Sequence, residues 1–227
     1  MSQNSKGHLL GHVADLGGTT LANPKNRGYQ THEQLPFHCD SCDVVGLLCL
    51  QPAKSGGEST VTSSLNIYNE MLKRRPDLVA ALVEPVYRDR RNEIPKGRDP
   101  WFQLPVFNFE QDYLTVSWQG GYIRSASRFE ELPPQSQNLR DGLDMFAALA
   151  RELSYGMDFQ QGDIQFLHNH VTVHSRTEFE DFPELDRRRN LLRLWIATPG
   201  ARPLSPAYKN RYGDLKPGVR PAGGVIV

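Results

Sequence analysis

Short runs of β-favouring residues recur along this chain, and each is bounded by glycine, proline or polar turn residues. Val, Ile, Thr and aromatic side chains favour extended backbone, and strands this short need partners in a sheet. The runs are not separated by regularly alternating helices, so they predict a β-sandwich or barrel rather than a parallel sheet with crossover helices. The predicted strands cover residues 43–50, 59–63, 105–109, 113–118, 163–167, 171–174 and 190–198.

Two other segments follow a helical period. Ser64 is expected to cap a helix that ends before Pro76, with a further turn or two over 77–84, and a second helix is expected from about Pro134 to Leu153. Apolar stripes of this kind are typical of core packing, so we do not interpret them as cofactor-binding faces. The stripes comprise Leu65, Tyr68, Met71 and Leu72 in the first helix and Leu139, Leu143, Phe146, Leu149, Ala150 and Leu153 in the second.

The remaining segments are assigned to loops of one domain. A length of 227 residues fits a single domain with a substantial core, here 1–227, with 1–35 as a lead-in and 207–227 as a turn-rich tail. The charged, proline-containing segment 87–105 is predicted as a long loop over the sheet. Long loops on a rigid β scaffold often act as lids.

Charge and hydropathy exclude several function classes. Lys and Arg total 26 and Asp and Glu total 26, so the net charge is zero and gives no global case for nucleic acid or an anionic membrane. The longest apolar runs, such as VVGLLCL, fall far short of the ~18 to 20 residues of a membrane helix. The first residues carry neither a secretory nor a transit pattern, so we expect a cytoplasmic protein. The sequence leaves open whether it forms a homo-oligomer.

Three cysteines, Cys39, Cys42 and Cys49, lie within a few residues of one another. An odd, clustered count argues against a disulfide framework. Cys39 and Cys42 form a C-x-x-C, which is half of a zinc site or a redox motif, but no second C-x-x-C and no βαβ pattern accompanies it. We therefore interpret the cysteines as small buried hydrophobic residues.

The stretch PFHCDSCD at 36–43 places His38 and Asp40 two residues apart. In an extended segment these two side chains share a face while Cys39 points away. An imidazole and a carboxylate side by side can chelate a divalent metal, although a lone His-x-Asp pair is also common at solvated strand ends. A third ligand is needed to choose between the two.

Candidates for that ligand occur about 130 residues later, where GDIQFLHNHVTVHSRTEFED holds His168, His170 and His174. Two histidines and one carboxylate make a facial triad, which leaves positions open on ferrous iron. Beyond them, Arg189 and Arg193 stand four apart on one otherwise apolar face of a predicted strand. Two guanidinium groups there are costly unless they meet anions, and the alternative is a solvated edge strand.

These motifs, in this order, resemble the taurine dioxygenase (TauD/TfdA) family of iron(II)- and 2-oxoglutarate-dependent dioxygenases. The resemblance rests on PFHCD, GGESTVTSS, GDIQFLHNHVTVHSRTEFED and RRNLLRLWI, and it runs from about Pro36 to Pro206. It implies a mainly β fold with flanking helices, a double-stranded β-helix or jelly-roll. It also implies Fe(2+) as metal, 2-oxoglutarate and O2 as cosubstrates, and oxidation, usually hydroxylation, of a small organic molecule with release of succinate and CO2.

The resemblance also implies roles for individual residues. His38, Asp40 and His174 match the catalytic iron ligands, and His174 is chosen because it alone ends a short strand with VHSRT. Arg189 matches the arginine that binds the distal carboxylate of 2-oxoglutarate. Arg193 matches one that meets an anionic substrate group, with a structural ion pair equally open.

Two further positions follow from the same comparison. Ser59 stands where the family has a threonine that helps hold the cosubstrate, with Thr60 and Thr62 as near alternatives. If the strand at 171–174 runs regularly, His170 shares a face with His174 and packs behind the metal. A simply packed or solvated His170 is the alternative that we prefer.

Departures from the family keep other functions open. Only 37 residues precede His38, fewer than in family members, which leaves open whether the early strands of the β-helix are complete. A truncated, non-catalytic relative that binds metal or oxoacid, or acts as an interaction module, is therefore the alternative to an enzyme. A zinc hydrolase with the same ligands is a third hypothesis, which leaves Arg189 and Arg193 unexplained.

Overall fold

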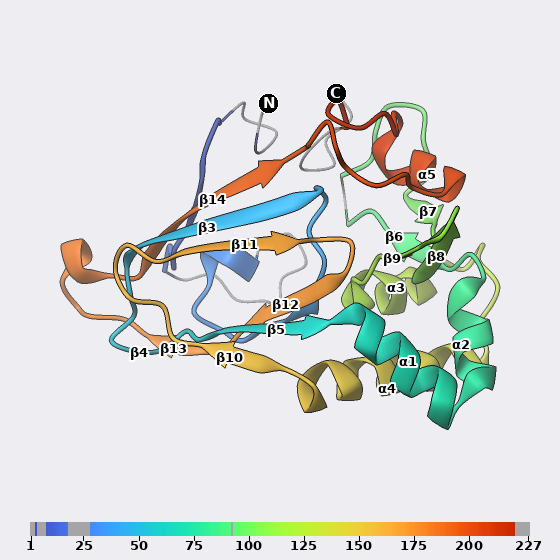
Figure 1. The fold of residues 1–227 in the computed structure, drawn as a ribbon, viewed down its shortest axis with the longest axis horizontal. Coiled ribbons are helices and arrows are strands. Elements are labelled where there is room, and N and C mark those ends of the chain that lie inside the picture. Colours follow the sequence, from blue (N-terminus) through green and yellow to red (C-terminus); the bar gives the residue numbers. More distant parts are fainter. Residues whose placement is uncertain (1–2, 4–7, 18–27, 92, 221–227) are drawn as a thin grey trace.

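Two four-stranded antiparallel sheets form the centre of the molecule in the computed structural model, which describes residues 3, 8–17, 28–91 and 93–220 (Figure 1). The first sheet has the order β1-β14-β3-β11, formed by Gly11–Val13, Asn190–Ile196, Val44–Gln51 and Ile164–His168. The second has the order β10-β5-β12-β2, formed by Tyr155–Met157, Ser59–Ser63, Thr172–Arg176 and Leu35–His38. The strands predicted from the sequence at 43–50, 59–63, 163–167, 171–174 and 190–198 are confirmed to within a few residues.

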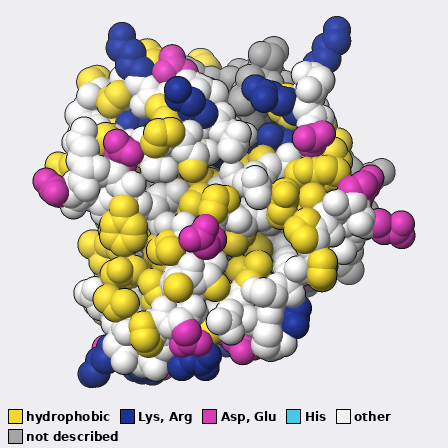
Figure 2. All heavy atoms as spheres, turned by 90° about the vertical axis from the view of Figure 1, so that its right-hand side faces the viewer, with side chains coloured by type: hydrophobic (Ala, Val, Ile, Leu, Met, Phe, Trp, Pro, Cys, Tyr) yellow, Lys and Arg dark blue, Asp and Glu magenta, His cyan; other side chains and the backbone are white. Residues whose placement is uncertain are grey.

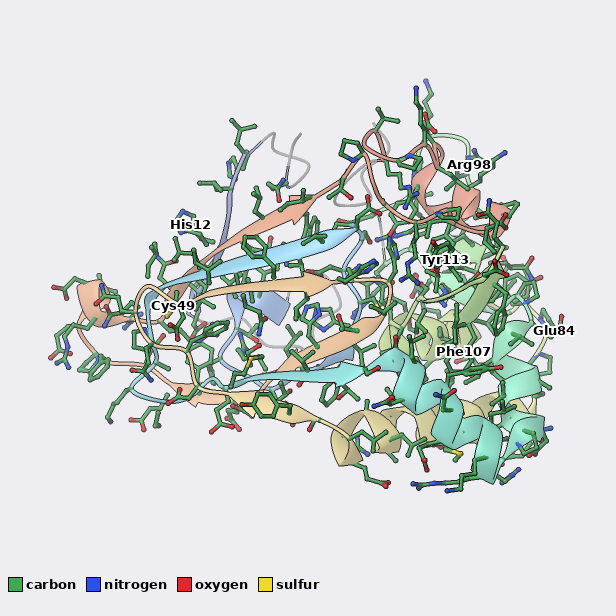
Figure 3. All side chains as sticks on the ribbon, in the orientation of Figure 1. His12, Cys49, Glu84, Arg98, Phe107 and Tyr113 are labelled. Atoms are coloured by element: carbon green, nitrogen blue, oxygen red, sulfur yellow. The ribbon has the colours of Figure 1, made fainter. Side chains whose placement is uncertain are left out.

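Apolar side chains from both sheets meet between them. Val45 and Leu167 of the first sheet pack with Val61 of the second. Because side chains alternate along a strand, each sheet turns every second residue toward this interior. Further along β3 and β14, Cys49 and Leu191 form a second apolar cluster with Phe159, and Figure 3 shows Cys49 at the end of the sheets away from the helices.

The helices lie at the other end of the sheets (Figure 1). They are α1 (Ser64–Arg74), α2 (Pro76–Val83), α3 (Gly120–Ser125) and α4 (Gln137–Glu152). The cap of α1 is Ser63 rather than the predicted Ser64, because the Ser63 hydroxyl accepts the Asn66 amide at 3.3 Å. Pro76 opens α2 at a position where its missing N–H costs nothing.

A large apolar core joins these helices to the sheets. The predicted stripe of α4 is confirmed, since Leu143, Phe146, Leu149 and Ala150 are buried in this core and Leu139 and Leu153 pack against it. Ile67 and Met71 of α1 and Leu82 of α2 complete it, together with Phe107, which Figure 3 shows on the helical side. Seen from that side, Figure 2 shows hydrophobic atoms across the middle of the face and many of the Lys and Arg atoms near its margins.

The prediction of one long loop at 87–105 is wrong at its two ends, where strands form. β6 (Tyr87–Asp89) and β7 (Trp101–Gln103) pair as a small antiparallel ladder. Arg88 is completely buried and donates to the carbonyl oxygens of Leu104, Pro105 and Ser117. Arg88 thus anchors the segment, and none of the segment's described residues lines the pocket described below.

Small elements complete the described chain. A hairpin is formed by β8 (Phe107–Glu110) and β9 (Tyr113–Val116). A separate two-stranded ladder pairs β4 (Ser55–Gly56) with β13 (Phe179–Glu180), which lies far along the chain. Short helical turns occur at Gly28–Gln30, Ala126–Arg128, Leu185–Arg187, Pro206–Tyr208 and Lys209–Tyr212 (α5). The tail expected at 207–227 is packed as far as it is described, since Tyr208 and Tyr212 are buried with Phe102. Within the described ranges, every helix is too short or too polar to cross a bilayer.

Candidate functional site

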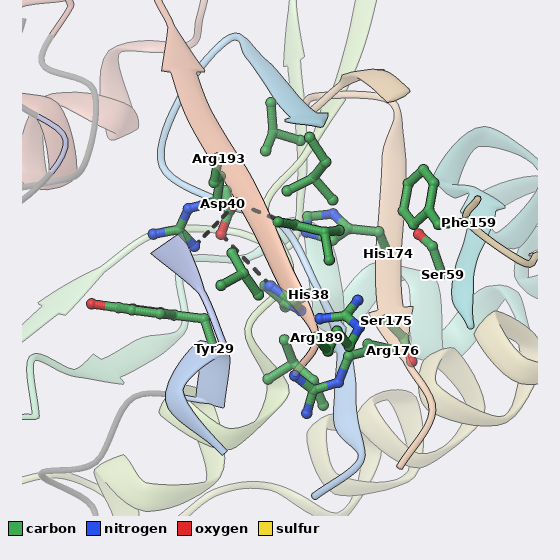
Figure 4. A pocket seen from close by; sticks show the side chains of 15 residues that line it. Tyr29, His38, Asp40, Ser59, Phe159, His174, Ser175, Arg176, Arg189 and Arg193 are labelled. Atoms are coloured by element: carbon green, nitrogen blue, oxygen red, sulfur yellow. Dashed lines mark ion pairs between the residues drawn. The ribbon is translucent and has the colours of Figure 1, made fainter. Parts of the chain in front are cut away.

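His38, Asp40 and His174 converge between the two sheets (Figure 4). His38 ends β2 and His174 lies on β12, and the antiparallel register pairs these two residues directly. Their ring centroids are 4.3 Å apart. Asp40 follows β2, with Oδ1 3.6 Å from His38 Nε2 and Oδ2 3.8 Å from His174 Nε2. One nitrogen or oxygen from each residue lies within 4.8 Å of the others, a spacing that suits a shared metal ion.

Hydrogen bonding and burial prepare the donors for a metal. His38 Nδ1 lies 2.9 Å from the Pro36 carbonyl oxygen, which can only accept, so Nδ1 donates there and Nε2 is the ring nitrogen that faces Asp40. Burial lowers the pKa of His174 to about 3 and keeps its ring neutral. Burial raises the pKa of Asp40, but Arg193, His38 and His174 outweigh it and hold that pKa well below its usual range. Ionised carboxylate and neutral imidazoles are the forms that bind metal.

Asp40 is fixed from two directions. Its backbone N–H donates to Asn169 Oδ1 at 2.8 Å, and Asn169 Nδ2 returns hydrogen bonds to the carbonyl oxygens of Asp40 and Cys42. Trp195 Nε1 donates to Asp40 Oδ2 at 2.6 Å. One carboxylate oxygen is thereby held by the indole, which leaves Oδ1 free toward His38. Neither Asn169 nor Trp195 was predicted from the sequence as a site residue.

Arg193 lies beside this carboxylate. Its Nη1 is 3.9 Å from Asp40 Oδ2, close enough for charge attraction but too far for a hydrogen bond. Its guanidinium carbon sits 4.1 Å from the centroid of the Trp195 ring and 4.7 Å from that of Tyr29. The two aromatic faces hold the cation in place. The structure thus places Arg193 in the pocket lining, where its guanidinium group faces the Asp40 carboxylate.

Arg189 lies on the other side of His38 in Figure 4 and also lines the pocket. Its backbone N–H donates to Asp181 Oδ1 at 2.8 Å, and its Nη2 donates to the Gly57 carbonyl oxygen at 3.4 Å. Its Nη1 is buried without a partner. Burial lowers the pKa of Arg189 to about 10, so the group remains charged at neutral pH. A buried cation with a free donor in a pocket is suited to an anion.

The Gly-Gly turn before β5 makes room for this arginine. Gly57 has φ +74°, and a Cβ built there would lie 3.0 Å from Arg189 Nε. At Gly56, with φ +70°, a Cβ would lie 2.3 Å from the Glu178 carbonyl oxygen. Both positions therefore exclude larger residues through backbone conformation as well as space.

Two of the three hydroxyl candidates, Ser59 and Thr62, lie on opposite faces of β5. Ser59 lines the pocket and its hydroxyl lies 3.3 Å from Gln165 Oε1. Thr62 faces the helices instead, where its hydroxyl donates to the Ala150 carbonyl oxygen at 2.6 Å. Strand alternation explains the difference, since residues three apart point to opposite sides. The structure therefore does not bring Thr62 to the pocket.

His170 belongs to a separate buried network. It stands in the turn before β12 rather than in the strand, and its Nε2 lies 2.9 Å from Asp43 Oδ1. The same oxygen accepts Arg220 Nη1 at 2.8 Å, and Asp43 Oδ2 accepts the Thr198 amide at 3.2 Å. The interpretation of His170 as a support behind the metal is wrong, because this network ties the C-terminal segment to the start of β3. The packed alternative is confirmed.

The cysteines take no part in the site. All three are free and buried. Cys39 points away from the pocket into the helix-side core, as the strand parity predicts. Burial raises the pKa of Cys39 to about 12, so it is a thiol at neutral pH and unsuited to metal binding or thiol exchange.

Comparisons with known proteins agree with this geometry. The family model described as "Taurine catabolism dioxygenase TauD, TfdA family" matches residues 1–195. FR-33289 synthase of Streptomyces rubellomurinus (strain ATCC 31215) is 32% identical over 232 residues, which cover 97% of this chain and 66% of the synthase. The chain thus spans just under two thirds of that relative.

Solved structures show the same fold. Asparagine oxygenase in complex with Fe(II), 2S,3S-3-hydroxyasparagine and succinate has a TM-score of 0.64 at 20% identity, covering 83% of this chain and 56% of the oxygenase. The non-heme iron oxygenase OrfP in complex with Fe and alpha-ketoglutaric acid has a TM-score of 0.61 at 18% identity, with the same two coverages. The predicted double-stranded β-helix is confirmed by these neighbours.

Proposed function

The chain belongs to the TauD/TfdA family of dioxygenases, and from that premise we propose that it is an iron(II)- and 2-oxoglutarate-dependent dioxygenase acting on a small organic molecule. The observation that carries the proposal is the convergence of His38, Asp40 and His174 in one pocket with an arginine whose Nη1 has no partner. Two imidazoles and one carboxylate are the donor set of non-haem iron oxygenases. Asparagine oxygenase and OrfP, with which this chain shares its fold, bind iron.

The residues present fit both groups. His38 and His174 offer their Nε2 atoms and Asp40 an ionised oxygen, so together they would hold iron(II). Arg189 would bind the far carboxylate of 2-oxoglutarate, and Ser59 lies on the same pocket wall. When bound, iron(II) supplies open positions at which the oxo acid and O2 react, so that a substrate C–H is oxidised while succinate and CO2 are formed.

The protein's own contribution is binding, orientation and exclusion of water. Apolar side chains line much of the pocket wall: Val13, Leu35, Val45, Leu47, Phe159 and Leu191. They keep the dielectric low around the charged groups, which strengthens the pairing of Arg189 with a carboxylate. Arg193 stabilises the ionised state of Asp40. Its binding of an anionic substrate group stays a prediction.

An anaerobic titration tests the proposal. Adding Fe(II) and 2-oxoglutarate to the protein should produce a visible metal-to-ligand charge-transfer band, and admitting O2 with a substrate should yield succinate. No band in the wild-type protein contradicts the proposal. A band without succinate across a broad substrate panel indicates the non-catalytic relative instead, and zinc-dependent hydrolysis without O2 indicates a hydrolase.

Trp195→Phe tests how Asp40 is oriented. The substitution removes the indole N–H that donates to Asp40 Oδ2 but keeps an aromatic face under Arg193. Partners that orient metal ligands usually contribute about 10- to 100-fold in metal affinity, and we expect a loss of Fe(II) affinity in that range. An anaerobic Fe(II) titration measures it. Trp101→Phe, a matched change in β7 outside the pocket, should leave the affinity unchanged, and equal affinities for both variants would show that the hydrogen bond is dispensable.

A further inference from the structure

A second buried arginine lies near Arg189. Arg176 ends β12, two residues after His174, and both of these residues line the pocket (Figure 4). The guanidinium carbon of Arg176 lies 4.7 Å from the centroid of the Phe179 ring, and that of Arg189 lies 5.2 Å from the same centroid. Arg176 is only 5% exposed and Arg189 only 4%. Two cations thus share one buried end of the pocket.

Nearby carboxylates do not neutralise this pair. Among the described residues, neither guanidinium lies within ion-pair distance of a carboxylate. Asp15 and Asp181 raise the pKa of Arg176, and Asp181 raises that of Arg189, all from beyond ion-pair distance. Asp15 is paired with His32, and Asp181 Oδ1 accepts the backbone N–H of Arg189 while its Oδ2 has no hydrogen-bond partner. Burial and the nearby charge of Arg189 together lower the pKa of Arg176 to about 10, and burial lowers that of Arg189 to about 10. Both groups remain charged at neutral pH.

In each arginine the terminal nitrogen Nη1 has no hydrogen-bond partner. Arg176 Nε donates to the Thr177 carbonyl oxygen at 3.3 Å and its Nη2 donates to that of Glu33, so the guanidinium is held by neutral acceptors. Its Nη1 is buried without a partner, as is Nη1 of Arg189. A buried donor left unpaired is costly, and here two charged donors are unpaired together.

We propose that Arg176 is a second cosubstrate-binding residue, which holds the far carboxylate of 2-oxoglutarate together with Arg189. A carboxylate has two oxygens and can accept from two guanidinium groups, and its single negative charge offsets part of their shared positive charge. The inference rests on the proposed function. The inference goes beyond that function because it attributes the selection of a 2-oxo dicarboxylate to two arginines. Arg176 lies on β12 beside His174, and Arg189 directly precedes β14.

The test compares two oxo acids that differ only at the far end. 2-Oxoglutarate and 2-oxopentanoate are titrated anaerobically into the Fe(II)-loaded protein, and the charge-transfer band gives both affinities without turnover. Arg176→Gln should weaken 2-oxoglutarate binding roughly 10- to 100-fold, the range for losing one charge-assisted hydrogen bond. Binding of 2-oxopentanoate should change little, so the preference for the dicarboxylate should shrink by a similar factor.

Two further variants keep the test decisive. Arg176→Lys keeps the charge and should retain more of the preference for 2-oxoglutarate over 2-oxopentanoate than Arg176→Gln does. If the glutamine variant folds poorly, the lysine variant still tests the inference. Arg187→Gln, at a half-exposed arginine paired with Glu184, should bind both acids like the wild type. Unchanged 2-oxoglutarate affinity in both Arg176 variants overturns the inference, as does an equal loss for both acids, which indicates a structural role. No band with the wild type overturns the proposed function and this inference with it.

Discussion

Asp40→Ala is expected to abolish Fe(II) binding at metal concentrations that saturate the wild-type protein. The carboxylate is the only anionic donor of the triad, and it faces both imidazoles. Losing a residue that merely orients a ligand costs about 10- to 100-fold in metal affinity, and losing the anionic ligand itself should exceed that. The charge-transfer band with 2-oxoglutarate should disappear, and with it the O2-dependent formation of succinate.

Two other variants separate loss of the ligand from loss of the fold. Asp40→Asn keeps an oxygen that can accept from Trp195 but removes the charge, so it should fold like the wild type and still bind Fe(II) far more weakly. Asp112→Ala, in the exposed turn between β8 and β9, changes an aspartate that is remote from the pocket and should leave the band intact. A band of normal intensity in Asp40→Ala would falsify the assignment of this carboxylate to the metal.

Local pattern carried much of the prediction of the site. The i, i+2 parity of an extended segment separates His38 and Asp40 from Cys39, and the structure has Cys39 in the helix-side core. The same parity turns Arg189 and Arg193 to one pocket with Leu191 between them. These relations lie within a few residues of one strand, where the backbone alone decides which way a side chain points.

Relations between distant segments were not predictable in this way. The hydrogen bonds of Asn169 to the backbone of Asp40 and Cys42 depend on how the turn before β12 meets the end of β2. Trp195 did leave a signal, because it continues the alternation of Arg189, Leu191 and Arg193, but its partner is 155 residues away. Arg176 left a similar signal two residues after His174. Its distinguishing feature is that no carboxylate of the described residues lies within ion-pair distance of it, which only the packed structure shows.

The wrong prediction of a loop at 87–105 and the rejected role of His170 behind the metal share a cause. In both, a solvated or functional role was considered for polar residues that the fold buries in hydrogen-bonded networks. His170 is locked by Asp43, and Arg88 is held by three backbone carbonyl oxygens. Burial of a charge is stable only where partners satisfy it, and those partners lie far along the chain.

The metal-free protein should lose stability as the pH falls below about 6.5, because of His174. The pKa of this side chain is about 3 in the folded protein, mainly through burial, and about 6.5 in an unfolded chain. Above pH 6.5 both states are neutral. Below it the unfolded state takes up a proton that the folded state refuses, so the free energy of unfolding falls by up to about 1.4 kcal/mol per pH unit until the folded pKa is reached.

Urea unfolding of the metal-free protein at pH 7 and pH 5 measures this effect. Between these values the carboxylates remain largely ionised in both states, since their unfolded pKa lies near 4. Burial also lowers the pKa of His168 and His170, so these two residues likewise reduce the free energy of unfolding as the pH falls. His174→Gln, which cannot take up a proton, isolates the contribution of His174. The wild type should lose about 2 kcal/mol more than this variant between the two pH values. Equal losses would show that His174 is protonated as readily in the fold as in the unfolded chain, which contradicts the lowered pKa of this ring.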